Sequence, residues 1–336
     1  MKILVIHVSS RIGDSLLVTP LIETIKHKFK NCKLSLFAHK RMHVLFQNNS
    51  DIDDIDVISV KRSKYKGWSF IKKFDLAFVV IGPEETDTSL IKYALRVSKK
   101  VVSYDSNSQK INKRLYKIAT KDFSKNTHII DYYHSLTGAL KINPSGKRVR
   151  FNSSTSELFS MQKVIASSAI KDCKVVLGLK ITSLSSRSYR DWPFKNFIEL
   201  SYLIGKEYSD IGFVMLGGLD EFDKLEKLSN KLDFPVLNLS GASLREIGSA
   251  INFLDLYIGV DTGFTHLVSS SDVPMVVLYH PLNPKEKYGP INHPDFHPID
   301  CLEELIINTD KENMMATIGP EQVFEKISLA LTGVIK

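Results

Sequence analysis

Residues 1–20, MKILVIHVSSRIGDSLLVTP, decide the fold of the N-terminal half of the chain. The short apolar run from Ile3 to Ile6 is followed by polar residues, which predicts a buried strand over Lys2–Val8 rather than a secretory signal. From Asp14 to about residue 29, apolar side chains recur at the spacing of one helix face: Leu16, Leu17, Leu21, Ile25 and Phe29. A strand, a glycine-containing turn and a helix in this order are the first unit of a parallel α/β sheet.

The same alternation of strands and helices continues through the first half of the chain. Further strands are predicted at Lys33–Ala38, Val57–Val60, Leu76–Ile81 and Lys100–Tyr104, with a short helix at Met42–Gln47. Strands separated by helices indicate a parallel, doubly wound sheet.

A polar, serine-rich stretch, Asn143–Ser156, interrupts this alternation and predicts a linker. The pattern then restarts, with helices expected at 157–168, 193–208, 220–232, 243–252 and 265–271 and strands at 174–179, 212–216, 236–238, 256–259 and 275–279. We therefore expect two Rossmann-like domains, residues 1–155 and 156–318, that face each other across a cleft and bind ligands at the carboxyl ends of their strands. A last helix within residues 319–336 is predicted to pack back on the first domain.

The net charge of +8 is distributed unevenly along the chain. Residues 1–150 carry 28 Lys and Arg against 13 Asp and Glu, whereas residues 151–336 carry 17 against 24. A basic half favours an anionic partner, such as nucleic acid, an anionic lipid surface or a phosphorylated glycan, although a solubilising lysine surface has the same composition. No apolar stretch approaches the roughly 18–20 residues of a membrane span, so we expect a cytoplasmic protein without a transmembrane segment.

Several classes of protein are disfavoured by missing motifs. The cysteines Cys32, Cys173 and Cys301 lie far apart, which favours free thiols over a disulfide framework or a zinc site. The sequence contains neither G-x-G-x-x-G after the first strand nor G-x-x-x-x-G-K-[ST], so nicotinamide dehydrogenases and P-loop nucleotidases are improbable. We expect neither a metal nor a cofactor.

The first candidate site is the loop Ser9-Ser10-Arg11-Ile12-Gly13-Asp14 between the first strand and the first helix. Asp14 fits two interpretations. It can be the N-cap of the helix, where a carboxylate accepts hydrogen bonds from free backbone N–H groups. It can also be a general base that removes a proton from an attacking hydroxyl.

The second candidate site is Ile258–His266, another strand, small turn and helix. Gly263 would allow backbone N–H groups to approach an anion at the start of the helix, and Thr262 and Thr265 would add hydroxyl donors. The alternative is an ordinary capped helix with His266 in the core.

The third candidate site is the loop Ser185–Pro193, in which arginine side chains could grip a phosphate with paired hydrogen bonds. A solvated basic loop is the alternative. Glu221, after the strand predicted at 212–216, could bind ribose or sugar hydroxyls, or could be an ordinary surface residue.

In this order and spacing, these segments resemble glycosyltransferase family 9, the lipopolysaccharide heptosyltransferases. The resemblance is carried by the opening M-K-I-L-V-I-H-V-S-S-R-I-G-D, by R-D-W-P at 190–193, by G-G-L-D-E at 217–221 and by V-D-T-G-F-T-H-L at 260–267. It extends over essentially the whole chain and implies a two-domain GT-B fold with inverting, metal-independent transfer.

The resemblance also implies roles for individual residues. Asp14 matches the catalytic aspartate, Arg190 a basic phosphate-binding residue and Glu221 a donor-binding glutamate. The other donor-binding positions match Ser185, Ser186, Asp261, Thr262, Gly263 and His266. One loop departs from the family, which often has Tyr/Phe-Gly-Pro-Thr where this chain has Tyr279-His280-Pro281-Leu282-Asn283-Pro284, and the departure could reshape the donor pocket.

The reaction implied is transfer of a heptose from ADP-heptose to the inner core of lipopolysaccharide. The acceptor would be an anionic glycolipid at the inner face of the inner membrane, with candidate contacts from Ser10, Arg11, Lys61, Arg62 and Lys64. One alternative is another sugar nucleotide used on a core, capsule or lipooligosaccharide acceptor, and a second is an inactive glycan-binding relative. A nucleic-acid-binding protein is disfavoured, because no recognisable RNA- or DNA-binding motif is present.

Overall fold

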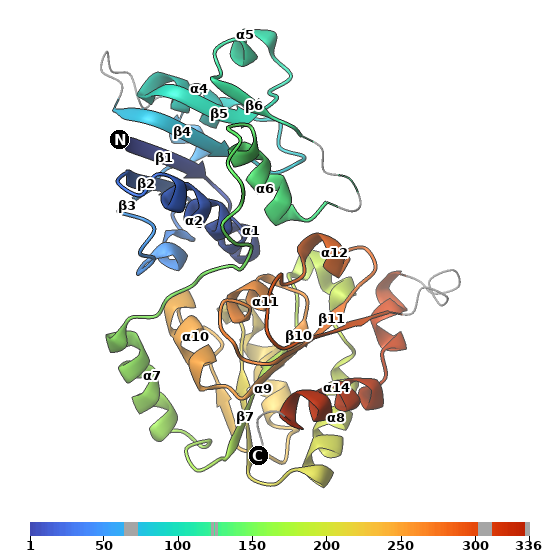
Figure 1. Cartoon of the computed structure of the whole chain (residues 1–336). Coiled ribbons are helices and arrows are strands. Elements are labelled where there is room, and N and C mark those ends of the chain that lie inside the picture. Colours follow the sequence, from blue (N-terminus) through green and yellow to red (C-terminus); the bar gives the residue numbers. More distant parts are fainter. Residues whose placement is uncertain (64–72, 122–123, 125–126, 302–310, 333–336) are drawn as a thin grey trace. The chain divides into compact units, whose positions relative to one another are not determined.

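The computed structural model describes residues 1–63, 73–121, 124, 127–301 and 311–332. Within these residues the chain divides into two compact units (Figure 1). The first unit contains Met1–Asn152 and the short segment Glu286–Ile291, and the second contains Ser153–Lys285 and the residues from Asn292 onward. The change of unit after Asn152 falls inside the stretch predicted as a linker.

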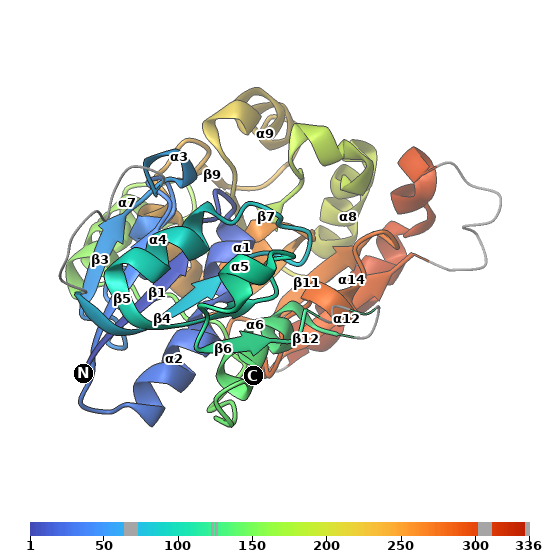
Figure 2. The same ribbon diagram turned by 90° about the horizontal axis from the view of Figure 1, so that it is seen from above.

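The first unit is built on a six-stranded parallel sheet in the order β3-β2-β1-β4-β5-β6. Its strands are β1 (Lys2–His7), β2 (Lys33–Ala38), β3 (Asp54–Val57), β4 (Phe74–Val80), β5 (Ser98–Tyr104) and β6 (Lys117–Ala119). Its helices are α1 (Ile12–Leu17), α2 (Thr19–Lys28), η1 (His43–Phe46), α3 (Val60–Ser63), α4 (Ser89–Val97), α5 (Gln109–Asn112) and α6 (Ile129–Gly138). Helix α4 packs on β4 and β5 (Figure 2), and α2 packs beside α6.

Strand β1 lies at the centre of this sheet, between β2 and β4. Its residues Ile3, Leu4, Val5 and Ile6 are fully buried, as expected for a central parallel strand that is covered by helices on both faces. The chain winds outward from β1 in one direction and then, from β4, in the other. The boundary between β1 and β4 is therefore the switch point of the sheet, where doubly wound proteins bind ligands.

The second unit repeats this topology, with the strand order β12-β11-β10-β7-β8-β9. Its strands are β7 (Val175–Lys180), β8 (Ile211–Met215), β9 (Val236–Asn238), β10 (Leu256–Val260), β11 (Met275–Tyr279) and β12 (Phe296–Asp300). Its helices are α7 (Thr155–Ala166), η2 (Ser185–Arg190), α8 (Phe194–Glu207), η3 (Leu219–Glu221), α9 (Phe222–Ser229), α10 (Leu244–Ala250), η4 (Ile251–Phe253), α11 (Gly263–Val268), η5 (Lys311–Thr317) and α14 (Pro320–Thr332). Helix α12 (Lys285–Tyr288) begins in the second unit and continues in the segment that belongs to the first. The switch point lies between β7 and β10, so the prediction of two doubly wound parallel sheets is confirmed.

Two predicted elements of the first half differ from the structure, and one observed strand was not predicted. The strand expected at Val57–Val60 is β3, Asp54–Val57, an edge strand with exposed aspartates that an apolar-run rule overlooks. The single helix expected from Asp14 is two helices that meet at Val18. Pro20, in the first turn of α2, has no N–H to continue the hydrogen-bond ladder of α1. The edge strand β6 was not predicted.

The C-terminal helix forms where it was predicted. Helix α14 lies beside α8 and against β10, β11 and β12 of the second unit. Its apolar face, Val323, Ile327, Ala330 and Leu331, is buried in the core of the second unit. The second sheet therefore buries this face.

Candidate active site

Asp14 follows the central strand β1 and lies in the first turn of α1. Arg11, with an extended backbone (φ −104°, ψ 139°), is the N-cap residue of this helix. The interpretation of Asp14 as an N-cap is therefore wrong. The half-buried carboxylate instead accepts a hydrogen bond from Ser9 Oγ at 3.0 Å, which fixes its orientation at the carboxyl end of β1.

His7, the last residue of β1, supports the backbone of Asp14. Its Nε2 donates to the Asp14 carbonyl at 3.0 Å, and the edge of its ring meets Tyr133 of α6 with the centroids 5.7 Å apart. Burial lowers the pKa of His7, so the imidazole is neutral at neutral pH and can make this donation. Sequence analysis missed His7, although a polar residue that ends an otherwise apolar strand was a usable signal.

Only part of the predicted acceptor site can be examined. Ser10 and Arg11 are exposed beside Asp14. Lys61 is exposed in α3, which follows β3 on the same carboxyl edge of the sheet, with β2 between β3 and β1. Arg62 also belongs to α3, and Lys64 lies outside the described residues. The structure therefore places Ser10, Arg11 and Lys61 along one edge of the first sheet.

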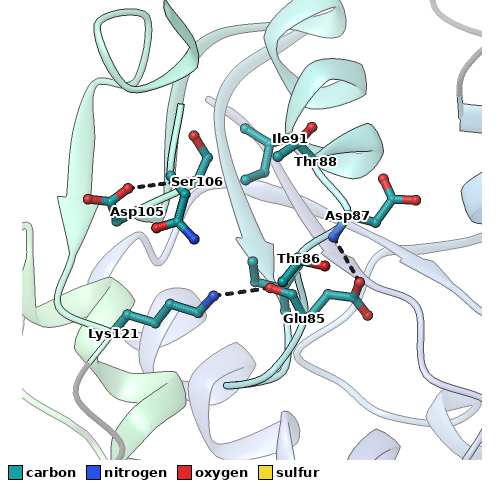
Figure 3. A pocket seen from close by; sticks show the side chains of 10 residues that line it. Glu85, Thr86, Asp87, Thr88, Ile91, Asp105, Ser106 and Lys121 are labelled. Atoms are coloured by element: carbon teal, nitrogen blue, oxygen red, sulfur yellow. Dashed lines mark hydrogen bonds between the residues drawn. The ribbon is translucent and has the colours of Figure 1, made fainter. Parts of the chain in front are cut away.

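A small hollow opens where β4 and β5 end in the first unit (Figure 3). Glu85, Asp87 and Asp105 give it an acidic lining, and Lys121 Nζ is bonded to the backbone carbonyl of Glu85 at 3.1 Å. Carboxylates repel phosphate groups, so this hollow does not suit the anionic part of an acceptor. Its hydroxyl and amide lining comes from Thr86, Thr88, Ser106 and Asn107.

In the second unit, three loops converge on Asp261, which directly follows β10. Arg190 Nη1 donates to Asp261 Oδ2 at 2.9 Å and to the Asp261 carbonyl at 3.2 Å. The Asn283 side-chain amide, from the loop after β11, donates to the same carboxylate oxygen. Asp261 and Arg190 are only 3% and 7% exposed. Arg190 was predicted to grip a phosphate, but one of its two terminal nitrogens holds Asp261, and Nη2 makes no hydrogen bond within the described residues.

The carboxyl group of Asp261 is buried among groups that favour its ionised form. Burial raises the pKa of Asp261 to about 6, although Arg190, Asn283 and Arg187 all favour its ionised form. Arg187 is thus close enough to act on this carboxylate, and its side chain is half-buried. Arg190 forms an ion pair with this carboxylate, whereas Arg187 acts on it only through the electrostatic attraction of its charge.

The turn after Asp261 is a capped helix start. Thr262 is the N-cap of α11, and its hydroxyl accepts from Phe264 N at 3.2 Å, while Thr265 Oγ1 accepts from Thr262 N at 3.1 Å. Both threonine hydroxyls therefore serve the cap. Gly263 is half-buried at the first position of α11, and His266 is 5% exposed within the same helix.

The loop after β7 is held by a carboxylate that sequence analysis did not single out. Asp191 Oδ1 accepts from Ser183 N at 2.6 Å and from Ser183 Oγ at 2.7 Å, and Asp191 Oδ2 pairs with Lys224 Nζ at 3.0 Å. These bonds close the loop around η2. Ser185 and Ser186, predicted near the phosphates, are both exposed on that turn.

Glu221, the predicted donor-binding glutamate, has a partner on each oxygen. Its Oε2 accepts from Gly218 N at 2.6 Å, and its Oε1 forms an ion pair with Lys180 Nζ. Sequence analysis missed Lys180 because the predicted strand ended at residue 179, so this lysine was expected in the following loop. In the structure Lys180 is the last residue of β7, and it is buried.

Among the described residues, no three His, Cys, Asp or Glu side chains are grouped so that they could hold a metal ion. None of the helices formed by these residues is long and apolar enough to cross a membrane.

Comparison with known proteins agrees with the resemblance in the sequence. Over 136 residues the chain is 25% identical to the lipopolysaccharide core heptosyltransferase OpsX of Haemophilus influenzae, an alignment that spans 40% of this chain and only 38% of that protein. It is 21% identical to lipooligosaccharide heptosyltransferase 2 of Campylobacter jejuni over 96% of this chain and 97% of that protein.

The fold has a close counterpart among solved structures. The ADP-heptose lipopolysaccharide heptosyltransferase II of E. coli superposes with a TM-score of 0.81 at 17% identity and covers the whole of both chains. The predicted GT-B fold is thereby confirmed. The family model for glycosyltransferase family 9 (heptosyltransferase) matches residues 73–305, more than half of the chain. The protein is therefore a member of glycosyltransferase family 9, the heptosyltransferase family.

Proposed function

We propose that this glycosyltransferase moves a heptose from ADP-heptose to the inner core of lipopolysaccharide, with inversion at the anomeric carbon and without a metal. One observation carries the proposal. The residues that match the family's catalytic and donor-binding positions lie at the carboxyl ends of the central strands of the two sheets, where doubly wound proteins bind ligands. The names of the relatives, which refer to ADP-heptose, to the lipopolysaccharide core and to lipooligosaccharide, support the donor and the acceptor.

The second unit provides the groups for the donor. Glu221 is a partly exposed carboxylate with a fixed orientation, which suits it to accept hydrogen bonds from sugar or ribose hydroxyls, whereas the buried Asp261 holds Arg190 in place. Arg190 Nη2 and Arg187 supply positive charge for the diphosphate, so the protein itself offsets the charge that develops on the leaving group. Ser185 and Ser186 add exposed hydroxyls on the same loop.

The first unit provides the base. In the proposed step, Asp14 takes the proton of the acceptor hydroxyl while that oxygen forms a bond to the anomeric carbon. The bond from the anomeric carbon to the diphosphate breaks on the opposite face, and its electron pair leaves with ADP. Ser9 and His7 hold the carboxylate and the backbone of Asp14 in place for this step.

The acceptor is proposed to be an anionic glycolipid at the cytoplasmic face of the inner membrane. The excess of Lys and Arg in residues 1–150 and the exposed Arg11 and Lys61 on the edge that carries Asp14 support this assignment. The protein would then act as a peripheral protein of that membrane surface.

A second candidate uses the same chemistry with another sugar nucleotide. The observation that favours it is the hydrogen bond from Asn283 to Asp261, because Asn283 belongs to the loop in which this chain departs from the family. A change in the sequence of that loop can therefore alter Asp261, which matches a donor-binding position of the family.

A donor screen tests the proposal. Thermal unfolding is followed with ADP, GDP, UDP, CDP and their available sugars, since a ligand at 100 times its Kd stabilises the native state by about 2.7 kcal/mol. ADP and ADP-heptose should give the largest shifts, and mass spectrometry should detect one added heptose on a heptose-free inner-core acceptor. A larger shift with another sugar nucleotide would select the second candidate. No shift with any nucleotide, together with no transfer, would refute both.

A further inference from the structure

Lys180 lies in the middle of the second sheet, where a charge is rare. It is the last residue of β7, which pairs with β10 on one side and with β8 on the other. Only 3% of the residue is exposed. Its register partner is Gly259, where a Cβ atom would lie 2.5 Å from Tyr257 Oη and 3.0 Å from Lys180 Cβ, so the glycine leaves room for both side chains.

Three groups from three segments surround the ammonium. Lys180 Nζ donates to Thr182 Oγ1 at 3.1 Å and forms an ion pair with Glu221 Oε1. It also lies 5.0 Å from the centroid of the Phe264 ring, within the range of a cation–π contact. Thr182 follows β7, Glu221 follows β8 and Phe264 belongs to α11, so one ammonium joins the loops after three neighbouring strands.

Burying the ammonium group of Lys180 costs free energy, and the packing of the sheet does not require a charged side chain at this position. An apolar side chain of similar length would fill the same space without desolvating a charge. Burial lowers the pKa of Lys180, and the nearby carboxylate of Glu221 opposes this effect because it stabilises the charged ammonium. Glu221 remains 14% exposed at the side chain, so solvent or a ligand reaches it whereas Lys180 is sealed.

We infer that Lys180 is a positioning residue for the sugar-nucleotide donor, which it serves by fixing the carboxylate of Glu221 without touching the donor itself. With Oε1 held by Lys180 and Oε2 held by Gly218 N, the carboxylate has one orientation, and its remaining lone pairs are available to donor hydroxyls. Lys180 also holds Phe264, next to the Thr262 cap of α11. The inference rests on the proposed function of the second unit.

A double-mutant cycle tests it. Lys180→Met, Glu221→Gln and the double variant are compared with wild type for donor Kd, for the KM of each substrate, for kcat and for Tm. Lys180→Met should raise donor Kd and donor KM by about 10- to 100-fold, the range for a hydrogen bond to a charged group, and leave kcat and acceptor KM within about threefold. Because Lys180 acts through Glu221, the double variant should bind the donor no more weakly than Glu221→Gln alone.

The matched control is Lys174→Met, at the residue directly before the same strand. Lys174 forms an exposed ion pair with Asp210 at 3.0 Å, so its loss should leave donor binding unchanged. If Lys180→Met does not fold, Lys180→Arg replaces it. That variant keeps the charge but moves Glu221, and it should weaken donor binding at least threefold.

Two results would overturn the inference. One is a folded Lys180 variant with a lower Tm but wild-type donor affinity, which would make the ion pair purely structural. The other is multiplicative loss in the double variant, which would mean that the two residues act independently. The proposed function fails on a different result, namely a wild-type protein that no sugar nucleotide stabilises.

Discussion

Replacing Asn283 by alanine should make donor binding more sensitive to acid. The Asn283 amide donates to Asp261 Oδ2, a bond that favours the ionised carboxylate. Burial already raises the pKa of Asp261 to about 6. Removing the amide raises this pKa further, because it takes away one of the groups that oppose the effect of burial.

The structure allows the size of this effect to be worked out. A hydrogen bond to a charged group that contributes about 1.4 kcal/mol corresponds to about one pH unit, so the midpoint should move from about 6 to about 7. If donor binding requires ionised Asp261, which holds Arg190, about half of the wild type and about a tenth of the variant are competent at about pH 6. Donor affinity should therefore differ about fivefold there and hardly at all at about pH 8.

Isothermal titration calorimetry with the sugar nucleotide chosen by the donor screen, across this pH range, measures the effect. Asn252→Ala is the matched control, since its amide donates to backbone carbonyls in α10 of the same unit. Parallel pH profiles for Asn283→Ala and wild type would refute the reasoning. A uniform loss of affinity at every pH would refute it too, because it would show that Asn283 acts through packing and not through the charge of Asp261.

Three further predictions concern the base, the metal and the acceptor. Ser9→Ala should lower kcat about 3- to 10-fold with unchanged donor Kd, as expected when a hydrogen bond that orients Asp14 is lost; an unchanged kcat would remove Ser9 from the mechanism. Transfer activity should survive a chelator, and an enzyme that EDTA inactivates and magnesium or manganese restores would contradict metal-independent transfer. Reversing the exposed Lys110, Lys113 and Lys117 to Glu should raise acceptor KM and leave donor Kd unchanged, with an effect that shrinks as salt screens exposed charges beyond about 10 Å at 0.1 M. Unaltered acceptor kinetics would mean that these lysines are only a solvated surface.

Much of the fold was predictable because it depends on local apolar patterns. The strands Val236–Asn238 and Met275–Tyr279 have the predicted boundaries, and the alternation of elements led to two parallel sheets. The edge strand β3 escaped the same rule, since it carries exposed aspartates and its apolar side chains are only half-buried. The sequence of α14 predicts a helix with one apolar face but not the surface on which that face packs. That surface is formed by α8 and by strands distant in the sequence.

The candidate site was predictable as a set of positions but not as a set of contacts. Asp14, Arg190, Glu221 and Asp261 could be identified from motifs at the ends of strands. The ion pair of Arg190 with Asp261 joins residues 71 positions apart, so its presence emerges only when β7 and β10 are placed side by side. Lys180 could not be identified from the sequence, because a lysine at the end of an apolar run is expected to be exposed to solvent. Only the fold shows that its ammonium group is buried and paired with Glu221.

The most direct test of the account is the turnover of Asp14→Asn with donor and acceptor both saturating, measured beside its donor Kd. The substitution keeps the shape of the side chain and its contact with Ser9 but removes the base. The account predicts that kcat falls by about 10²-fold or more, the scale of general-base catalysis, while donor Kd and Tm stay close to wild type. Near-normal turnover in a variant that binds the donor would contradict it and would leave Asp14 as a structural residue of the first loop.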